Sequence, residues 1–170
     1  MRLDIAQALQ MTGVEIPFLL CEEMPDTQWN GDRFHFLTPV EVRGVFSAVK
    51  ETVWVRAEVQ ARVQVPCADC LQDAEYAASA SMEVCFAREP DPEDPDVFSY
   101  AGHVLLLEDA VLGALWLEMP MRILCRPDCR GLCPVCGTDR NTTECACREE
   151  PAGKQPFSAL ASLLIEDEEV

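Results

Sequence analysis

Eight of the ten cysteines lie in closely spaced groups, and thiols at this spacing are typical metal ligands. Cys67 and Cys70 form a CxxC pair, and a second run of 23 residues contains Cys125, Cys129, Cys133, Cys136, Cys145 and Cys147. Two residues between cysteines let the chain turn around one ion, and a glycine after the pair, such as Gly137, tolerates the positive φ that the turn needs. In a reducing compartment such bunched pairs favour metal binding over disulfides.

The eight cysteines divide into two sets of four. Cys145 and Cys147 follow closely enough to complete a site with Cys133 and Cys136, which leaves Cys67, Cys70, Cys125 and Cys129 for a second site. Each set suits Zn²⁺, which takes four thiolates at about 2.3 Å. The count favours two zinc ions per chain. The spacing leaves open one zinc with spare thiols, another partition such as Cys129 with Cys133 and Cys136, or an iron–sulfur cluster.

No catalytic centre is apparent in the sequence. A catalytic zinc keeps an open position, commonly beside histidine or carboxylate ligands. The two histidines, His35 and His103, lie in strand-like segments without ligand spacing, and the sequence has no nucleophile elbow, phosphate loop or HExxH motif. A redox role for Cys67 and Cys70 lacks the expected strand-then-helix context. We therefore predict structural metal sites, no catalytic residues and no enzyme.

The charge balance is strongly acidic, with a formal net charge of -17. Such a surface repels phosphate backbones, which argues against extensive direct binding of nucleic acid and favours basic protein partners. Between residues 119 and 156 six basic residues stand against five acidic ones, while the rest of the chain is strongly acidic, so any RNA contact is expected there. The N-terminus lacks an apolar signal stretch and no apolar run is long enough to cross a bilayer, so we expect a cytoplasmic protein without membrane contact.

Period-two alternation predicts two long strands, from Val53 to Val65 and from Tyr76 to Phe86. About ten residues separate them, which favours an antiparallel hairpin with Cys67 and Cys70 at its tip. Cys85 falls on the polar side of its strand and is left out of the metal sites, while Cys21 is expected to be a small buried hydrophobe.

Shorter elements are predicted around this hairpin. Extended segments are expected at 14–20 and 33–37, with a turn at 29–32, and a short hairpin is expected from 97–100 and 103–107. Helices are expected at 107–119 and 156–165. The predicted fold class is α+β, with a β-rich antiparallel sheet body, two short helices and a cysteine-rich zinc-binding insert. One integrated domain would comprise the body (1–120), the zinc segment (121–150), and a docking helix with an acidic tail (151–170).

Several of these strings resemble one family. They are Val63-Gln-Val-Pro-Cys67-Ala-Asp-Cys70, Leu107-Glu-Asp, Met119-Pro120, Leu124-Cys125-Arg-Pro-Asp-Cys129-Arg-Gly131-Leu132-Cys133-Pro134-Val135-Cys136-Gly137 and Pro156-Phe157-Ser-Ala-Leu160. In order and spacing they resemble the YceD family, the large ribosomal RNA subunit accumulation protein of bacteria and plastids, over roughly residues 45–165. The resemblance implies a role in accumulation or processing of the 23S rRNA precursor, with no enzymatic activity.

The expected function is therefore that of a non-enzymatic ribosome-biogenesis factor. Its partners would be pre-23S rRNA or large-subunit assembly intermediates, reached through basic ribosomal or processing proteins, with no small-molecule substrate. The alternative, from another class, is a cysteine-based redox switch or zinc-storage protein. A nuclease would need an acidic metal cluster that the sequence does not provide.

Overall fold

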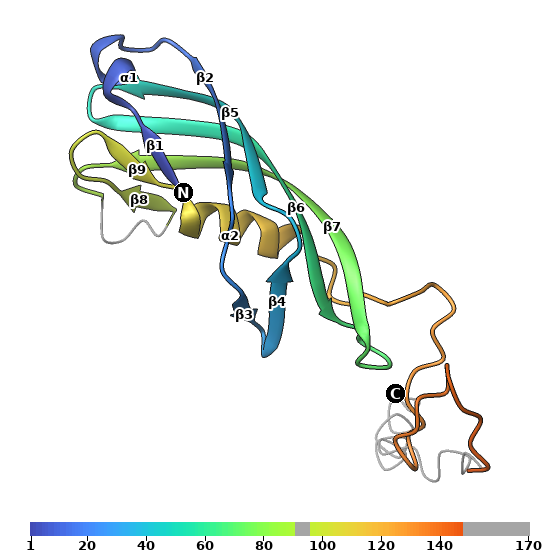
Figure 1. Cartoon of the computed structure of the whole chain (residues 1–170). Coiled ribbons are helices and arrows are strands. Elements are labelled where there is room, and N and C mark those ends of the chain that lie inside the picture. The colour runs from blue at the N-terminus through green and yellow to red at the C-terminus, as the bar shows by residue number, and fades with distance from the viewer. Residues whose placement is uncertain (91–95, 148–170) are drawn as a thin grey trace, which may run out of the picture.

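The computed structural model is a long, twisted, mostly antiparallel sheet that carries one helix on a face and ends in a loop-rich segment (Figure 1). The structure describes residues 1–90 and 96–147. Its elements are β1 (Arg2–Asp4), α1 (Ala6–Gln10), β2 (Ile16–Glu22), β3 (Thr27–Trp29), β4 (Asp32–Phe36), β5 (Val40–Val49), β6 (Thr52–Pro66), β7 (Asp73–Ala87), β8 (Val97–Ser99), β9 (Val104–Leu106) and α2 (Glu108–Glu118).

Strand β6 is the centre of the main sheet. It pairs with β7 along its whole length, from Thr52 opposite Ala87 to Pro66 opposite Asp73. On its other side β6 pairs first with β5 and then, nearer the tip, with β4. Strand β2 extends the sheet beyond β5, and β3 extends it beyond β4. The predicted antiparallel hairpin is confirmed, and both strands run a few residues beyond the predicted bounds.

One face of the β6–β7 hairpin forms the core. Val53, Val55, Val59 and Val63 are fully buried, whereas the alternating residues Trp54, Arg56 and Glu58 are exposed, as the period-two pattern predicts. Helix α2 covers this face and buries Val111 and Leu115. Its first turn carries Glu108 and Asp109, which favour a helix N-terminus electrostatically. The helix predicted at 107–119 is confirmed.

An aromatic cluster joins the β3–β4 hairpin to α2. The Trp29 and Trp116 rings stack with centroids 5.2 Å apart, and Phe34 lies 4.7 Å from the Trp116 ring. The predicted turn between β3 and β4 places Asn30 and Gly31 at positive φ, the conformation of a tight hairpin turn. The cluster therefore fixes this hairpin against the end of the helix that leads to the cysteine-rich segment.

The predicted hairpin at 97–107 is wrong. Strand β8 pairs in parallel with β7, and β9 pairs antiparallel with β1; only the bridge between Ala101 and Val104 joins the two segments directly. Each strand has three residues, too few for a stable isolated hairpin, so tertiary partners decide their pairing. Leu105 becomes fully buried in this arrangement.

The remaining predictions about the fold have mixed outcomes. The coarse fold class, mostly antiparallel sheet with two helices, is confirmed, but one of the two is the short α1 near the N-terminus. The helix predicted at 156–165 and the acidic tail lie outside the described residues. Cys21 is exposed on edge strand β2, so its predicted burial is wrong. None of the described helices has the length and apolar character that a membrane span needs.

Two glycines provide a test of the close contact between β5 and β6, with helix α2 as the control. A Cβ on Gly44 of β5 would overlap the backbone of Arg56 and Ala57 on β6, whereas a Cβ on Gly113 of α2 would meet nothing within 4 Å. We expect Gly44→Ala to lower the free energy of unfolding by about 2 kcal/mol through overpacking. Gly113→Ala should raise it by about 1 kcal/mol, because alanine favours the helix. Urea unfolding measures both, and equal effects would contradict the β5–β6 contact.

Candidate metal centre

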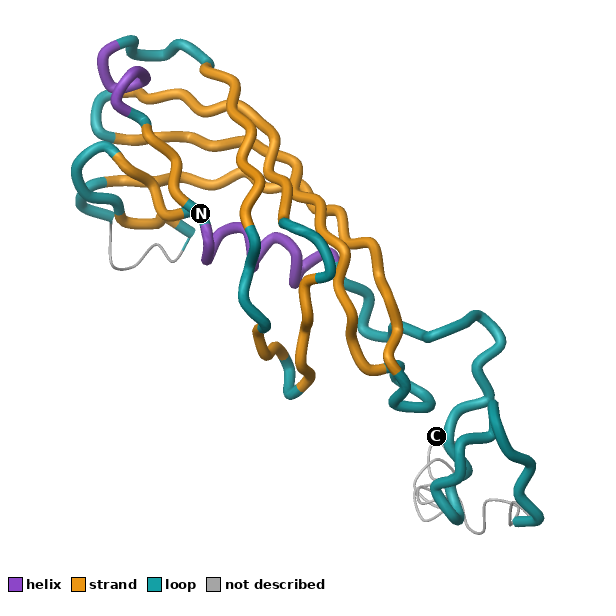
Figure 2. Tube along the Cα trace, in the orientation of Figure 1, coloured by secondary structure: helices purple, strands orange, loops and turns teal. Residues whose placement is uncertain are grey.

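The tip of the β6–β7 hairpin lies against the segment that follows α2 (Figure 2). The Ala68 N–H donates to the Ile123 carbonyl at 2.9 Å, and the Leu132 N–H donates to the Asp69 carbonyl at 2.9 Å. Cys67 and Cys70 are buried at this contact, in a small apolar cluster of their own that also includes Leu124 and Leu132. The hairpin tip and the segment 122–132 therefore form one packed unit.

Four thiols meet inside this unit. Cys67 Sγ lies 3.8 Å from Cys129 Sγ, and Cys70 Sγ lies 3.5 Å from Cys125 Sγ; all four sulfurs lie within 4.8 Å of one another. A tetrahedral ion with sulfurs at about 2.3 Å places them about 3.8 Å apart. The first quartet, defined as Cys67, Cys70, Cys125 and Cys129, thus has the separations that one four-coordinate metal ion requires.

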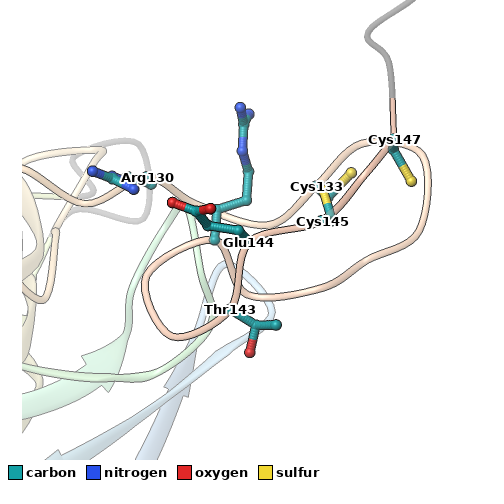
Figure 3. Close-up of a pocket in the computed structure, with 7 residues that line it drawn as sticks. Arg130, Cys133, Thr143, Glu144, Cys145 and Cys147 are labelled. Carbon is teal, nitrogen blue, oxygen red and sulfur yellow. The ribbon is translucent and has the colours of Figure 1, made fainter.

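A second quartet lies within the loop that follows. It consists of Cys133, Cys136, Cys145 and Cys147, whose sulfurs also lie within 4.8 Å of one another. Cys133, Cys145 and Cys147 line a hollow of about 570 Å³ together with Arg130 and Glu144. Figure 3 labels these side chains. Cys133 is buried, whereas Cys136 and Cys147 are exposed. The second quartet is therefore more open to solvent than the first.

The two CxxC turns share one backbone conformation. Leu71 and Gly137, each directly after the second cysteine, have φ of 61° and 72°. Their N–H groups donate to the carbonyls of Cys67 and Cys133 at 3.0 and 2.8 Å. Glycine adopts positive φ without strain, but leucine does so rarely. The repeated turn at Leu71 indicates that the surrounding contacts impose this conformation on the hairpin tip.

Asp69, between the two cysteines of the tip, anchors the segment. Its carboxylate accepts hydrogen bonds from Arg122 Nε at 3.2 Å and Arg122 Nη2 at 2.5 Å. The same ion pair raises the pKa of Arg122 above its ordinary value. Gly131 passes so close that an added Cβ would lie 3.1 Å from the Asp69 carbonyl oxygen. With the Leu132 hydrogen bond, these contacts hold the chain between the two quartets.

Asn141 connects the two quartets. Its Nδ2 donates to Cys129 Sγ at 3.4 Å and to Asp139 Oδ1 at 2.8 Å, while its Oδ1 accepts from the Arg130 N–H at 2.8 Å. A donor to a ligand sulfur orients that ligand and stabilises negative charge on it. Asn141 lies in the loop of the second quartet yet contacts a sulfur of the first, so the two groups are not independent.

The thiols of the first quartet have divergent pKa values. Burial acts to raise the pKa of Cys67, but hydrogen bonds from the backbone of Cys125 and other nearby residues outweigh it and lower the value to about 6. A hydrogen bond from the Gln72 backbone acts to lower the pKa of Cys70, but burial and the adjacent cysteine side chains together raise it to about 12. Four packed thiols cannot all ionise without a cation, because each thiolate disfavours the next.

The thiols of the second quartet also have pKa values that are lowered at one cysteine and raised at others. Hydrogen bonds from the Thr138 hydroxyl and backbone lower the pKa of Cys136 to about 6. The hydrogen bond with Cys136 raises the pKa of Cys147 to about 12, and the side chain of Cys133 raises that of Cys145. A divalent cation would reverse the raised values, because it favours the charged form of every ligand. The donor set and its charge thus fit a metal ion.

The structure assembles the eight predicted cysteines in the two predicted sets of four. That they bind metal stays a prediction, as do the proposed segment boundaries. His35 lies outside both quartets, with its Nδ1 2.6 Å from Asp26 Oδ1. The sequence does not predict the contacts of Asp69, whose partner Arg122 lies 53 positions away, or those of Asn141, which depend on how the loop of the second quartet folds back to Cys129 and Arg130. For Asn141 the sequence offers no signal beyond its place between Cys136 and Cys145.

Comparison with known proteins identifies the family. The family model described as large ribosomal RNA subunit accumulation protein YceD matches residues 55–164, which include both quartets. The chain belongs to the YceD family. The family is named for large-subunit ribosomal RNA accumulation and not for an enzymatic activity.

Relatives of this YceD chain occur in mycobacteria. Proteins of Mycobacterium bovis and Mycobacterium tuberculosis, each named uncharacterized, are 33% identical over 95 residues, which is 53% of this chain and 46% of each relative. A Mycobacterium leprae protein, also named uncharacterized, is 28% identical over 105 residues, or 59% of this chain and 48% of its own length. The match thus spans about half the length of these relatives. No solved structure matches the chain.

Gly131 and Gly137 provide a matched test of the contact at Asp69. Both have positive φ, but only Gly131 has a neighbour that an added Cβ would press against. Alanine at either position should cost about 1 kcal/mol in backbone strain. We expect Gly131→Ala alone to accelerate hydrogen exchange at the Leu132 N–H about ten-fold, because its bond to Asp69 is displaced. Equal exchange in both variants would contradict the anchoring role.

Proposed function

We propose that this chain is a non-enzymatic ribosome-biogenesis factor that supports accumulation or processing of the 23S rRNA precursor and assembly of the large subunit. The observation that carries the proposal is the YceD match over residues 55–164, which names large-subunit ribosomal RNA accumulation. The site chemistry is consistent with it, because two closed four-thiol groups offer no open position for a substrate. The protein would act in the cytoplasm, where ribosomal subunits assemble.

We further propose that each quartet holds one structural Zn²⁺. Thiolates are preferred ligands of zinc, and sulfur separations of 3.5 and 3.8 Å suit its tetrahedral geometry. The first quartet would hold Cys67, Cys70, Cys125 and Cys129 together, and the second would hold Cys133, Cys136, Cys145 and Cys147. A zinc ion with four thiolates carries a net charge of -2, so metal binding leaves the segment acidic.

The acidic surface favours a basic protein as the direct partner. With a net charge of -17, the chain should approach ribosomal RNA through basic ribosomal or processing proteins more readily than alone. Arg126 and Arg130 lie beside the quartets, and Arg126 pairs at 3.7 Å with the exposed Asp128. If the chain contacts RNA directly, these arginines are the groups that would reach phosphates.

Metal content tests the two-site arrangement. Protein purified without chelator should contain about two zinc ions per chain by elemental analysis. Cys67→Ser and Cys145→Ser should each lose about one zinc. Only Cys67→Ser should lower the melting midpoint of the sheet, on the order of 5 °C, because its quartet ties the hairpin tip to a distant segment. Equal shifts in the two variants would show that the ligands are wrongly assigned to sites.

The cellular role is tested in a strain that lacks the gene. We expect 23S precursor to accumulate and mature large subunits to decrease, with a smaller effect on the small subunit, in sucrose gradients and precursor-end mapping. The intact gene should restore the profile, and a Cys21→Ser variant should do so equally, because Cys21 lies outside both quartets. A normal rRNA profile in the deletion strain would refute the proposal.

One observation favours a redox switch or zinc store as the second candidate. Cys136 is exposed, and Thr138 lowers its pKa to about 6, which gives it thiolate character and access to oxidants. Such a switch would release zinc from the second quartet under peroxide while the first quartet, with Cys67 and Cys70 buried, retains its metal. A chromogenic zinc chelator distinguishes the candidates: rapid release of about one zinc at low peroxide supports the switch, and retention of both supports the structural role.

A further inference from the structure

Strand β7 has a long open edge. It pairs with β6 on one side over its full length, but on the other side it pairs only with β8, through Cys85, Phe86 and Ala87. Among the described residues no strand or loop pairs with the rest of this edge, residues 73–84. Figure 1 shows β7 as the outermost long strand of the sheet, running from β8 to the hairpin tip.

The direction of the backbone groups along this edge follows from one hydrogen bond. The Ala87 carbonyl accepts from the Tyr100 N–H at 3.1 Å, so the peptide groups of Ala87 point away from β6. In a regular strand this direction alternates, and the register of β7 is continuous. The N–H and C=O groups of Glu75, Ala77, Ser79, Ser81 and Glu83 therefore face outward, available to another strand.

A groove runs beside the part of this edge that lies nearest β8, at residues 81–84. It has a volume of about 440 Å³ and lies between β7, β8 and α2. Apolar side chains, including Val84, Phe98 and Leu117, line it, and Gly113 leaves its wall open because a Cβ there would meet nothing within 4 Å. The ionisable residues that line the groove are all acidic: Glu83, Asp96, Asp109 and Glu118. An apolar floor with acidic walls suits a chain with alternating apolar and basic side chains.

We infer that the edge of β7 from Glu75 to Glu83 is a docking site for an extended basic segment of a protein partner, which adds one strand to the sheet. Backbone hydrogen bonds to the outward peptide groups would supply affinity. Apolar side chains of the added strand would enter the groove on the α2 side, and its lysines or arginines would face Glu83 on the other side of the sheet. The carboxylates of Asp109 and Glu118 in the groove would add to the attraction for a basic segment. This inference rests on the proposed function in one respect: ribosome assembly supplies partners rich in such basic segments.

The acidic charge of this surface favours a basic protein segment over a second copy of the chain or RNA. A second copy of the chain paired along the same edge would add its own Glu83 and groove carboxylates to this acidic set, which is unfavourable, whereas Glu75 already pairs with Arg62 at 3.3 Å. RNA phosphates would meet the same repulsion from the groove. Acidic side chains at an open edge also disfavour pairing between two copies of the same chain. They do not disfavour pairing with a basic strand from another protein.

Hydrogen exchange on the full-length protein tests the inference with internal controls. The probe is a synthetic peptide of about ten residues that alternates lysine and valine, at about 0.15 M salt. Without peptide, the outward N–H groups of Ala77, Ser79 and Ser81 should exchange fast, while those of Ala78 and Ala80, bonded to β6, stay protected. With peptide, the outward set should slow about ten-fold or more. No change in the outward set would overturn the inference.

Variants separate strand addition from general attraction to an acidic protein. Glu83→Gln with Glu118→Gln should weaken peptide binding about five-fold in fluorescence anisotropy. The matched pair Glu23→Gln with Glu58→Gln changes net charge equally, but both residues are exposed outside the groove, so it should have little effect. Equal weakening by the two pairs, or dimers that form along the edge in place of peptide complexes, would refute the site.

A backbone variant completes the test and separates it from the proposed function. Ser81→Pro removes one outward N–H without removing a bond to β6, and its folding is checked by urea unfolding. It should weaken peptide binding and reduce rescue of the rRNA profile in the deletion strain. If it rescues fully while the deletion strain still shows the rRNA defect, the docking site is wrong and the proposed function stands. If the deletion strain has no rRNA defect, the proposed function fails whatever the peptide does.

Discussion

The meeting of Cys67 and Cys70 with Cys125 and Cys129 is the interaction on which the rest of this molecule depends. These pairs lie 62 and 55 positions apart in the sequence, so their contact closes a long loop through the sheet and α2. A link across such a loop removes much conformational freedom from the unfolded chain. The described chain after α2 forms no regular strand or helix, and its position therefore depends on this quartet and on the contacts of Asp69.

The two quartets have different tasks in this account. The first includes two buried cysteines, Cys67 and Cys70, and joins the hairpin tip to the segment 122–132, so its loss would release the segment from the sheet. The second closes only the loop between Cys133 and Cys147 and stays partly exposed. Asn141 bridges them through its bond to Cys129 Sγ. The second loop therefore completes the surroundings of the first quartet, and the order of assembly should run from hairpin to first quartet to second.

The sequence was most informative where one regular pattern decided the structure. The alternation in β6 and β7 predicted a long hairpin because one face had to be buried, and the thiol spacing placed eight cysteines in two sets because four ligands saturate one ion. Where several segments could pair with one strand, the sequence did not predict which of them does. Strands β8 and β9 are too short to specify their own pairing, and Cys21 is exposed because it lies on the outward face of β2, as Pro17 and Leu19 do. The contacts of Asp69 exist only after the hairpin tip has met the segment after α2, and those of Asn141 only after its own loop has folded back to Cys129.

The same elements place the two proposed working surfaces at different parts of the molecule. The sheet carries an acidic, strand-accepting edge, and the thiol-rich end holds the arginines that would approach RNA. X-ray absorption at the zinc edge, on protein loaded with about two equivalents, tests the central claim most directly. We expect four sulfur neighbours per zinc at about 2.3 Å and no nitrogen or oxygen bound to the metal. A mixed shell with nitrogen or oxygen ligands would contradict it.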